Sequence, residues 1–238
     1  NPHKSRNTMK TKSYLTTAAL PACALVLSGA FLSQAQAQDI VVNPTGASAT
    51  SQFNSREPTR TIEFNGNNFD LSDATIVETG DPIPSPWPTE GTTGSADMWL
   101  SDQSVTISAQ EIDYDLDKSY DLTGLHYWNS NESGSTDRGI NSVDIKFSND
   151  GGSTFFATVT ETFNEAPGLT SYEGETITFS STQTANHVAF DIQSNHGGAD
   201  FVGLAETRFT AVPEPASFAL IGGFLALGAV MLRRRRNS

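Results

Sequence analysis

Short runs in which every second residue is apolar fill the middle of the chain and constrain its fold. Residues 112–116 and 143–147 follow this period of two, with acids or other polar residues between the apolar ones. The pattern is typical of strands with one buried face. No segment between residues 38 and 212 sustains the 3.6-residue apolar period of a helix. The sequence therefore predicts an all-β fold, an antiparallel sandwich or jelly roll.

Turn-forming residues separate the runs. Asn149-Asp150-Gly151-Gly152 predicts a hairpin, because these residues tolerate the positive φ of tight turns. Residues 81–93 hold four prolines and predict a long loop that Trp87 anchors. Further strands are expected at 155–163, 176–180, 187–193 and 203–210.

The region between residues 38 and 212 is strongly acidic. It holds 26 Asp and Glu residues against six Arg and Lys, which gives a net charge of about −20. Such a charge repels phosphate backbones, so nucleic acid is not expected as a partner. The only cysteine, Cys23, precedes this region, so the domain is expected to be held by its core without a disulfide.

The N-terminal residues have the order of a secretory signal peptide. A basic segment, Met9-Lys10-Thr11-Lys12, precedes a mostly apolar stretch, and Ala35-Gln36-Ala37 presents small residues where signal peptidase cuts. The alternative is lipidation, because Leu20-Pro21-Ala22-Cys23 loosely resembles a lipoprotein box. We expect an upstream remnant at 1–8, a signal peptide at 9–37, one folded domain at 38–211 and a sorting tail at 212–238.

The C-terminal end has three parts in a fixed order. Pro213-Glu214-Pro215 precedes an uncharged apolar stretch of 17 residues, and the four arginines Arg233, Arg234, Arg235 and Arg236 follow. As a helix the stretch would span a membrane, and the arginines would stay cytoplasmic. This order resembles the PEP-CTERM sorting signal of Gram-negative bacteria, which implies removal of the tail by an exosortase-type enzyme during transfer to the cell surface. The alternative is a permanent single-pass anchor.

Residues 65–209 carry a second resemblance. Its most distinctive piece is Leu125-His126-Tyr127-Trp128-Asn129-Ser130-Asn131. The other pieces, in order, are 98–101, 114–116, 137–140, 147–151, 194–198 and 202–209. The set resembles the discoidin-type, galactose-binding-like jelly roll. The resemblance implies an eight-stranded, usually non-catalytic sandwich whose loops at one end often bind carbohydrate or lipid head groups, and often a structural calcium.

A calcium site could join the first and last strands. Calcium takes six to eight oxygens, and Asp70, Asp73 and Glu206 could supply carboxylates if those strands are neighbours. The chain departs from the resembled family here, since Leu71 stands where relatives carry a glycine. The open alternative is that the two aspartates form turns and Glu206 pairs with a neighbour.

Five residues form the predicted ligand site. A sugar site combines an aromatic face with amide, carboxylate or arginine groups for the hydroxyls. Two loops rich in Gly, Ser and Asn hold this inventory, in Trp128, Asn131, Glu132, Arg138 and His196. The alternative is structural, with Trp128 as a core or rim anchor and Arg138 in an ion pair.

The sequence does not indicate an enzyme. It contains no Gly-x-Ser-x-Gly elbow, no His-Glu-x-x-His and no phosphate-binding glycine loop. His126 and His187 are expected to be packed or edge residues. We expect an exported, surface-sorted, non-catalytic protein that binds carbohydrate or exopolysaccharide in the extracellular matrix. The alternative is a structural matrix or coat protein, which a flat, polar loop end would favour over a deep aromatic-lined loop pocket.

Overall fold

The computed structural model describes residues 38–62, 78–89, 98–198 and 200–214. The predicted signal peptide, Asp70, Asp73, Pro215, the apolar stretch and the four arginines lie outside these residues. Within the described ranges, no helix has the length and apolar character needed to cross a membrane. Of the predicted sorting motif, Pro213 and Glu214 are described, and the carboxylate of Glu214 forms an ion pair with Lys118.

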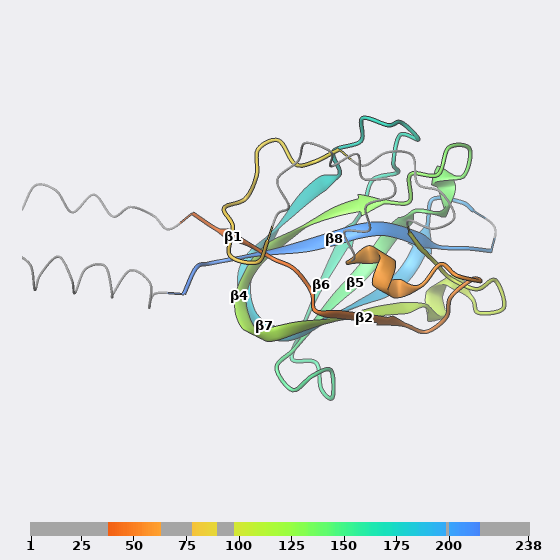
Figure 1. Ribbon diagram of the computed structural model, residues 1–238. Helices are drawn as coiled ribbons and strands as arrows, with labels where there is room; N and C mark the ends of the chain where they lie inside the picture. The colour runs from red at the N-terminus through yellow and green to blue at the C-terminus, as the bar shows by residue number, and fades with distance from the viewer. Residues whose placement is uncertain (1–37, 63–77, 90–97, 199, 215–238) are drawn as a thin grey trace, which may run out of the picture. The chain divides into compact units, whose positions relative to one another are not determined.

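The described chain is built from strands and three short 3-10 helices (Figure 1). The strands are β1 (Ile40–Val42), β2 (Gly46–Ala49), β3 (Trp99–Leu100), β4 (Glu111–Asn129), β5 (Ile140–Ser148), β6 (Ala157–Thr162), β7 (Glu175–Asn195) and β8 (Gly203–Ala211). The 3-10 helices are η1 (Pro58–Thr61), η2 (Ile107–Ala109) and η3 (Thr136–Arg138). The predicted hairpin joins β5 to β6, and Gly151 and Gly152 adopt positive φ there.

Two long strands take part in both layers of the sandwich. The first part of β4 pairs with β2 and with the last part of β7, which continues to β5 and β6. The last part of β4 pairs with the first part of β7 and with β8, which continues to β1 and β3. A register shift between Asp115 and Tyr120 marks the change, and both strands curve strongly there in Figure 1. All strand pairings are antiparallel, so the predicted antiparallel β-sandwich is confirmed.

Aromatic side chains fill the space between the layers. Tyr114, Phe190 and Phe209 meet edge to face, with ring centroids 5.2 to 6.3 Å apart. Tyr127 stacks on Phe163 at 3.8 Å. Each fully buried ring contributes about 1.5–3 kcal/mol by burial, and each well-oriented pair adds about 0.5–1.5 kcal/mol. Such a core can hold the domain without a disulfide.

A second, smaller cluster covers the outer face of β4. Leu125 and Tyr127 point into the main core, so the alternation of the strand places His126 and Trp128 on the opposite face. That face is not open to solvent, because Trp87 packs over it. Met98, Leu100, Trp128, Ala166, Tyr172 and Ala205 form the buried part of this second cluster.

Candidate functional site

Two loops meet at the end of the sandwich where β4 and β7 finish. Residues 130–139 lead from β4 to β5, and residues 196–202 lead from β7 to β8. The Gly198 amide donates to the Asp137 carbonyl at 3.0 Å, and the His196 amide donates to the Gly139 carbonyl at 3.2 Å. A Cβ on Gly198 would lie 3.0 Å from Cγ of Arg138, so glycine permits this close contact without a shift of the neighbouring loop. The two loops therefore hold each other in place.

One carboxylate at this loop end holds two arginines. Glu132 accepts hydrogen bonds from Nη1 and Nη2 of Arg56 at 3.0 and 3.4 Å, and from Nη1 of Arg138 at 3.3 Å. The side chains of Arg138 and Glu132 keep 29% and 27% of their surface exposed. The guanidinium of Arg138 also lies 5.2 Å above the ring of Phe201.

This cluster of Arg56, Glu132, Arg138 and Phe201, here called the loop-end cluster, suits the recognition of hydroxyl groups. A guanidinium offers donors in a fixed fork, and a carboxylate offers acceptors, so together they match a pair of neighbouring hydroxyls. Phe53 meets Phe201 edge to face at 5.1 Å, which supports the ring beneath Arg138. The loop end thus combines accessible polar groups with a rigid support. Arg56 was not predicted from the sequence.

Two of the predicted ligand residues are structural. Trp128 keeps only 2% of its surface exposed, and its Nε1–H donates to the Pro88 carbonyl at 3.2 Å. Its ring has no face open to a sugar, because the segment around Trp87 covers this side of β4. Asn131 is buried, donating to the Leu169 carbonyl at 2.7 Å and accepting from the Gly168 amide at 2.7 Å.

The remaining three predicted residues stay together at the loop end. Glu132 and Arg138 form the ion pair described above, which agrees with the structural alternative while leaving both groups accessible. His196 is half-buried, and its Nε2 lies 3.0 Å from the Phe163 carbonyl. Since a carbonyl only accepts, Nε2 carries a proton there, and His196 helps to fix the loop.

His126 is held in a single protonation state. Its Nε2–H donates to the Glu173 carbonyl and its Nδ1 accepts from the Thr176 hydroxyl, both at 2.8 Å. The ring stacks on Trp87 at 4.0 Å and 13°, and it meets Trp128 edge to face at 4.3 Å. Burial lowers the pKa of His126 to about 3, so the ring is neutral at physiological pH.

A pocket of about 520 Å³ opens beside this stack. It lies between the segment 83–87 and the start of β7, and its lining includes Trp87, His126 and Thr176. Gly174 forms part of the wall with φ +71°, and a Cβ there would lie 2.6 Å from both Nε2 of His126 and the Tyr127 carbonyl oxygen. Only glycine fits this close approach without strain.

Glu206, the predicted calcium ligand on the last strand, is buried in β8. Its Oε1 forms an ion pair with Nη2 of Arg208, which is the neighbour pairing that the sequence left open. Apart from this ion pair, neither carboxylate oxygen accepts a hydrogen bond within the described part of the chain. The described ranges also contain no group of three or more His, Cys, Asp or Glu that could hold a metal ion.

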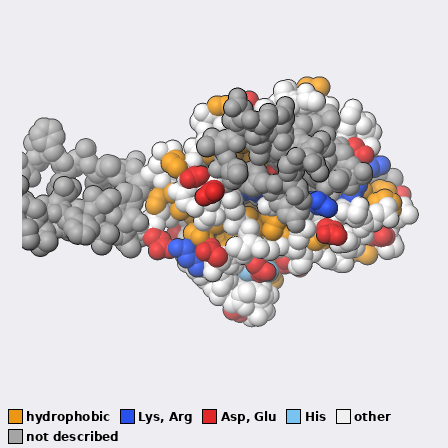
Figure 2. All heavy atoms as spheres, viewed as in Figure 1, with side chains coloured by type: hydrophobic (Ala, Val, Ile, Leu, Met, Phe, Trp, Pro, Cys, Tyr) orange, Lys and Arg blue, Asp and Glu red, His pale blue; other side chains and the backbone are white. Residues whose placement is uncertain are grey.

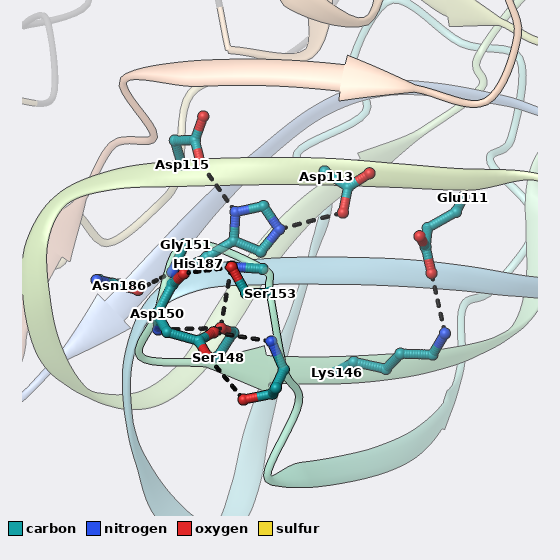
Figure 3. Close-up of polar contacts among 12 residues, drawn as sticks. Glu111, Asp113, Asp115, Lys146, Ser148, Asp150, Gly151, Ser153, Asn186 and His187 are labelled. Carbon is teal, nitrogen blue, oxygen red and sulfur yellow. Dashed lines mark hydrogen bonds and ion pairs between the residues drawn. The ribbon is translucent and has the colours of Figure 1, made fainter.

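Another polar cluster surrounds His187, away from the loop-end cluster (Figure 3). Nδ1 lies 2.8 Å from Oδ1 of Asp115, and Nε2 lies 3.1 Å from Oδ1 of Asp113. These hydrogen bonds, led by that to Asp113, raise the pKa of His187. Both nitrogens donate only when the ring is an imidazolium, so the contacts favour the charged form. The Asp150 loop packs against the ring, since a Cβ on Gly152 would lie 2.7 Å from Nε2.

The charged side chains do not gather in one patch on the face that Figure 2 shows. Asp and Glu side chains are scattered over its described part, among apolar and uncharged polar ones. In the loop-end cluster, two arginines share one carboxylate.

Comparison with known proteins gives one family and several distant structural likenesses. A family model described as F5/8 type C domain matches residues 83–207, slightly more than half of the chain. No curated protein matches the sequence.

Among solved structures, the family 32 CBM from C. perfringens NanJ in complex with galactose is 19% identical, with a TM-score of 0.47. That likeness covers 72% of this chain and 98% of the other. A Streptococcus pneumoniae fucose binding module is 13% identical over 71% of this chain and 93% of its own, with a TM-score of 0.45. Likenesses of this size do not identify a ligand.

Proposed function

Because the chain belongs to the F5/8 type C domain family, we propose that it is a non-catalytic domain that binds carbohydrate at its loop end. The observation that carries the proposal is the loop-end cluster, where Arg138 is fixed by Glu132 and Phe201 and yet stays accessible. A fixed guanidinium binds hydroxyls at a lower entropic cost than a mobile one.

The expected ligand is a neutral or weakly cationic glycan. The net charge of about −20 between residues 38 and 212 repels a strongly anionic polysaccharide unless a cation bridges the two. Affinity for a single sugar should be modest, because each hydrogen bond at an accessible site competes with water.

Export, sorting and calcium binding belong to the same proposal. The signal peptide at 9–37 directs export and is removed by signal peptidase, and the tail at 212–238 is read by an exosortase-type enzyme at Pro213-Glu214-Pro215. The protein then reaches the cell surface or the extracellular matrix and meets exopolysaccharide there. A structural calcium uses Glu206 with Asp70 or Asp73. The order of these segments supports export and sorting, and the acidic excess of the domain supports calcium binding.

A second candidate function is that of a structural matrix or coat protein without a specific small ligand. The burial of Trp128 and Asn131 favours it, because two of the five predicted ligand groups are used to hold the fold. The two functions differ in whether replacement of Arg138 changes binding of any glycan.

The test is a glycan-array measurement on the exported protein and three variants. Arg138→Ala should weaken binding at least about tenfold, since a lost charge-assisted hydrogen bond is worth about 1.5–3 kcal/mol. Arg138→Lys keeps the charge and loses the planar fork, so it should also bind more weakly. The matched control is Lys118→Ala, which removes one positive charge at a half-exposed site paired with Glu214. Equal binding by all four proteins, or by none, would favour the structural role.

A further inference from the structure

The pocket beside His126 is separate from the loop-end cluster. Its lining consists of Gln38, the segment 83–87, His126 and the segment 173–176. It shares no residue with the loop-end cluster. A volume of about 520 Å³ falls within the range of pockets that hold small molecules, roughly 300–1,000 Å³. A sugar ring therefore fits here without displacing the loop end.

The aromatic wall of this pocket is preorganised. Trp87 lies flat against His126, and His126 is itself fixed by hydrogen bonds at both nitrogens. Trp128 supports the stack from behind, with its ring 5.7 Å from that of Trp87. Pro84 and Pro86 add apolar surface of low conformational freedom. Rigid aromatic and proline surfaces are what the C–H face of a pyranose ring packs against.

The charges of the lining select among sugars. Glu173 and Glu175 carry the only ionised side chains among the lining residues, because His126 is neutral. Glu173 is exposed at the rim, while Glu175 already accepts hydrogen bonds from Tyr127 and Asn164. No lining residue is positively charged. A sugar with a carboxylate or sulfate would be repelled, and an ammonium group would be attracted both by Glu173 and by the indole of Trp87.

We propose that this pocket is a second glycan subsite, selective for an amino sugar whose ammonium group lies between Trp87 and Glu173. The proposal rests on the proposed glycan-binding function for the class of ligand, and on the pocket alone for its position and selectivity. The subsite would let one domain bind a polysaccharide at two places.

Tryptophan fluorescence can report on this pocket directly. Trp99 and Trp128 are buried, with 0% and 2% of their surfaces exposed, whereas Trp87 is partly exposed. The full chain, kept in mild detergent, is titrated with a hexamer of glucosamine, with its fully N-acetylated counterpart and with a hexamer of galacturonate. The three probes are all pyranose chains of one length that carry positive, neutral and negative charge at neutral pH or slightly below.

The glucosamine hexamer should change the fluorescence and bind at least about tenfold more tightly than the N-acetylated one, with an affinity that falls as salt rises. The galacturonate hexamer should give no change. Glu173→Gln should remove most of the preference for glucosamine and leave binding of the N-acetylated hexamer unaltered. Trp87→Ala should abolish binding of both. If that variant does not fold, Glu173→Gln decides, because it replaces an exposed side chain by one of nearly the same shape.

Three results would overturn the inference. They are equal affinities for the three hexamers, unchanged glucosamine binding by Glu173→Gln, and intact binding by a folded Trp87→Ala protein. Arg138→Ala separates this inference from the proposed function, because it should alter the glycan array and leave the Trp87 titration unchanged. Array binding that depends on Arg138, without any fluorescence change, would sink the second subsite and leave the loop-end function standing.

Discussion

His126 should make the stability of the domain depend on pH in a direction that follows from its surroundings. Burial lowers its pKa from 6.5 to about 3, and only 2% of its surface is exposed. The unfolded chain therefore binds a proton at His126 below about pH 6.5, whereas the folded chain does not until about pH 3. The stabilisation is complete above the unfolded pKa and is lost as the pH falls.

The size of the effect follows from this difference in proton binding. Between pH 8.0 and pH 5.0 the free energy of unfolding should fall by about 2 kcal/mol on account of His126 alone. For a domain of this size that lowers the melting temperature by about 4–8 °C. His126→Gln removes the titrating group and also two hydrogen bonds and one aromatic stack, so the variant should be about 2–4 kcal/mol less stable at pH 8. At pH 5.0 the difference in the free energy of unfolding between the variant and the wild type should be about 2 kcal/mol smaller than at pH 8.

The assay is urea unfolding of both proteins at pH 8.0, 6.5 and 5.0. The carboxylates titrate in both, so their contribution cancels in the difference between the two free energies. Lys118→Ala changes no group that titrates in this range. Its free energy of unfolding should therefore differ from that of the wild type by the same amount at all three pH values. If the difference in the free energy of unfolding between His126→Gln and the wild type is also the same at all three pH values, the reasoning is refuted. Such a result would mean that the folded protein protonates His126 as readily as the unfolded chain does.

Four further outcomes can be checked. The pKa of His187 is raised in the folded protein, so its contribution to stability is present below about pH 6.5 and is lost as the pH rises through the folded-state pKa. In Asp113→Asn the melting temperature should therefore decrease less as the pH rises. Gly174→Ala should lower the free energy of unfolding, measured by urea titration, by about 1–3 kcal/mol. The causes are strain at positive φ and the contact of the added Cβ with His126 and the Tyr127 carbonyl oxygen. Calcium at ~100 times its dissociation constant should add about 2.7 kcal/mol to the stability, and Glu206→Gln should abolish the gain; identical melts in calcium and chelator exclude the site. Mass spectrometry of the surface protein should find an end at 212–215, and a surface form that retains the final arginines contradicts tail removal.

The alternation of the sequence predicted where strands lie better than how far they run. The expected strands 176–180 and 187–193 are parts of one strand, β7, that runs from Glu175 to Asn195. The polar residues between them stay paired with β4, as Thr184 does with Asp121. The apolar pattern is interrupted there because the strand leaves one layer for the other, and of residues 181–186 Ala185 is the one buried in the core. A period of two cannot distinguish such a bend from a loop.

The site could be predicted only where its residues are close in sequence. Glu132 and Arg138 were found because they share a loop, whereas Arg56 lies 76 residues from Glu132 and carries no local signal. Trp128 was assigned to the ligand because it stands beside Asn131 and Glu132 in a segment that was predicted to be a loop, whereas it lies on β4. Whether another segment covers the outer face of β4 depends on tertiary packing, and here the segment around Trp87 does so. The same covering buries His126 and creates the pocket.

The two proposed subsites complement each other because their charges differ. The loop-end cluster offers the accessible guanidinium of Arg138 beside the carboxylate of Glu132, while the pocket offers Trp87 and Glu173 without a cation. A single sugar would meet only one of them and bind modestly. A polymer long enough to reach both would bind the second site as an intramolecular event, so its affinity would exceed that of either site without any new contact. A domain with two weak and differently charged subsites therefore discriminates by the length and composition of the polysaccharide, and a matrix protein can use such weak sites because its ligand is a long chain.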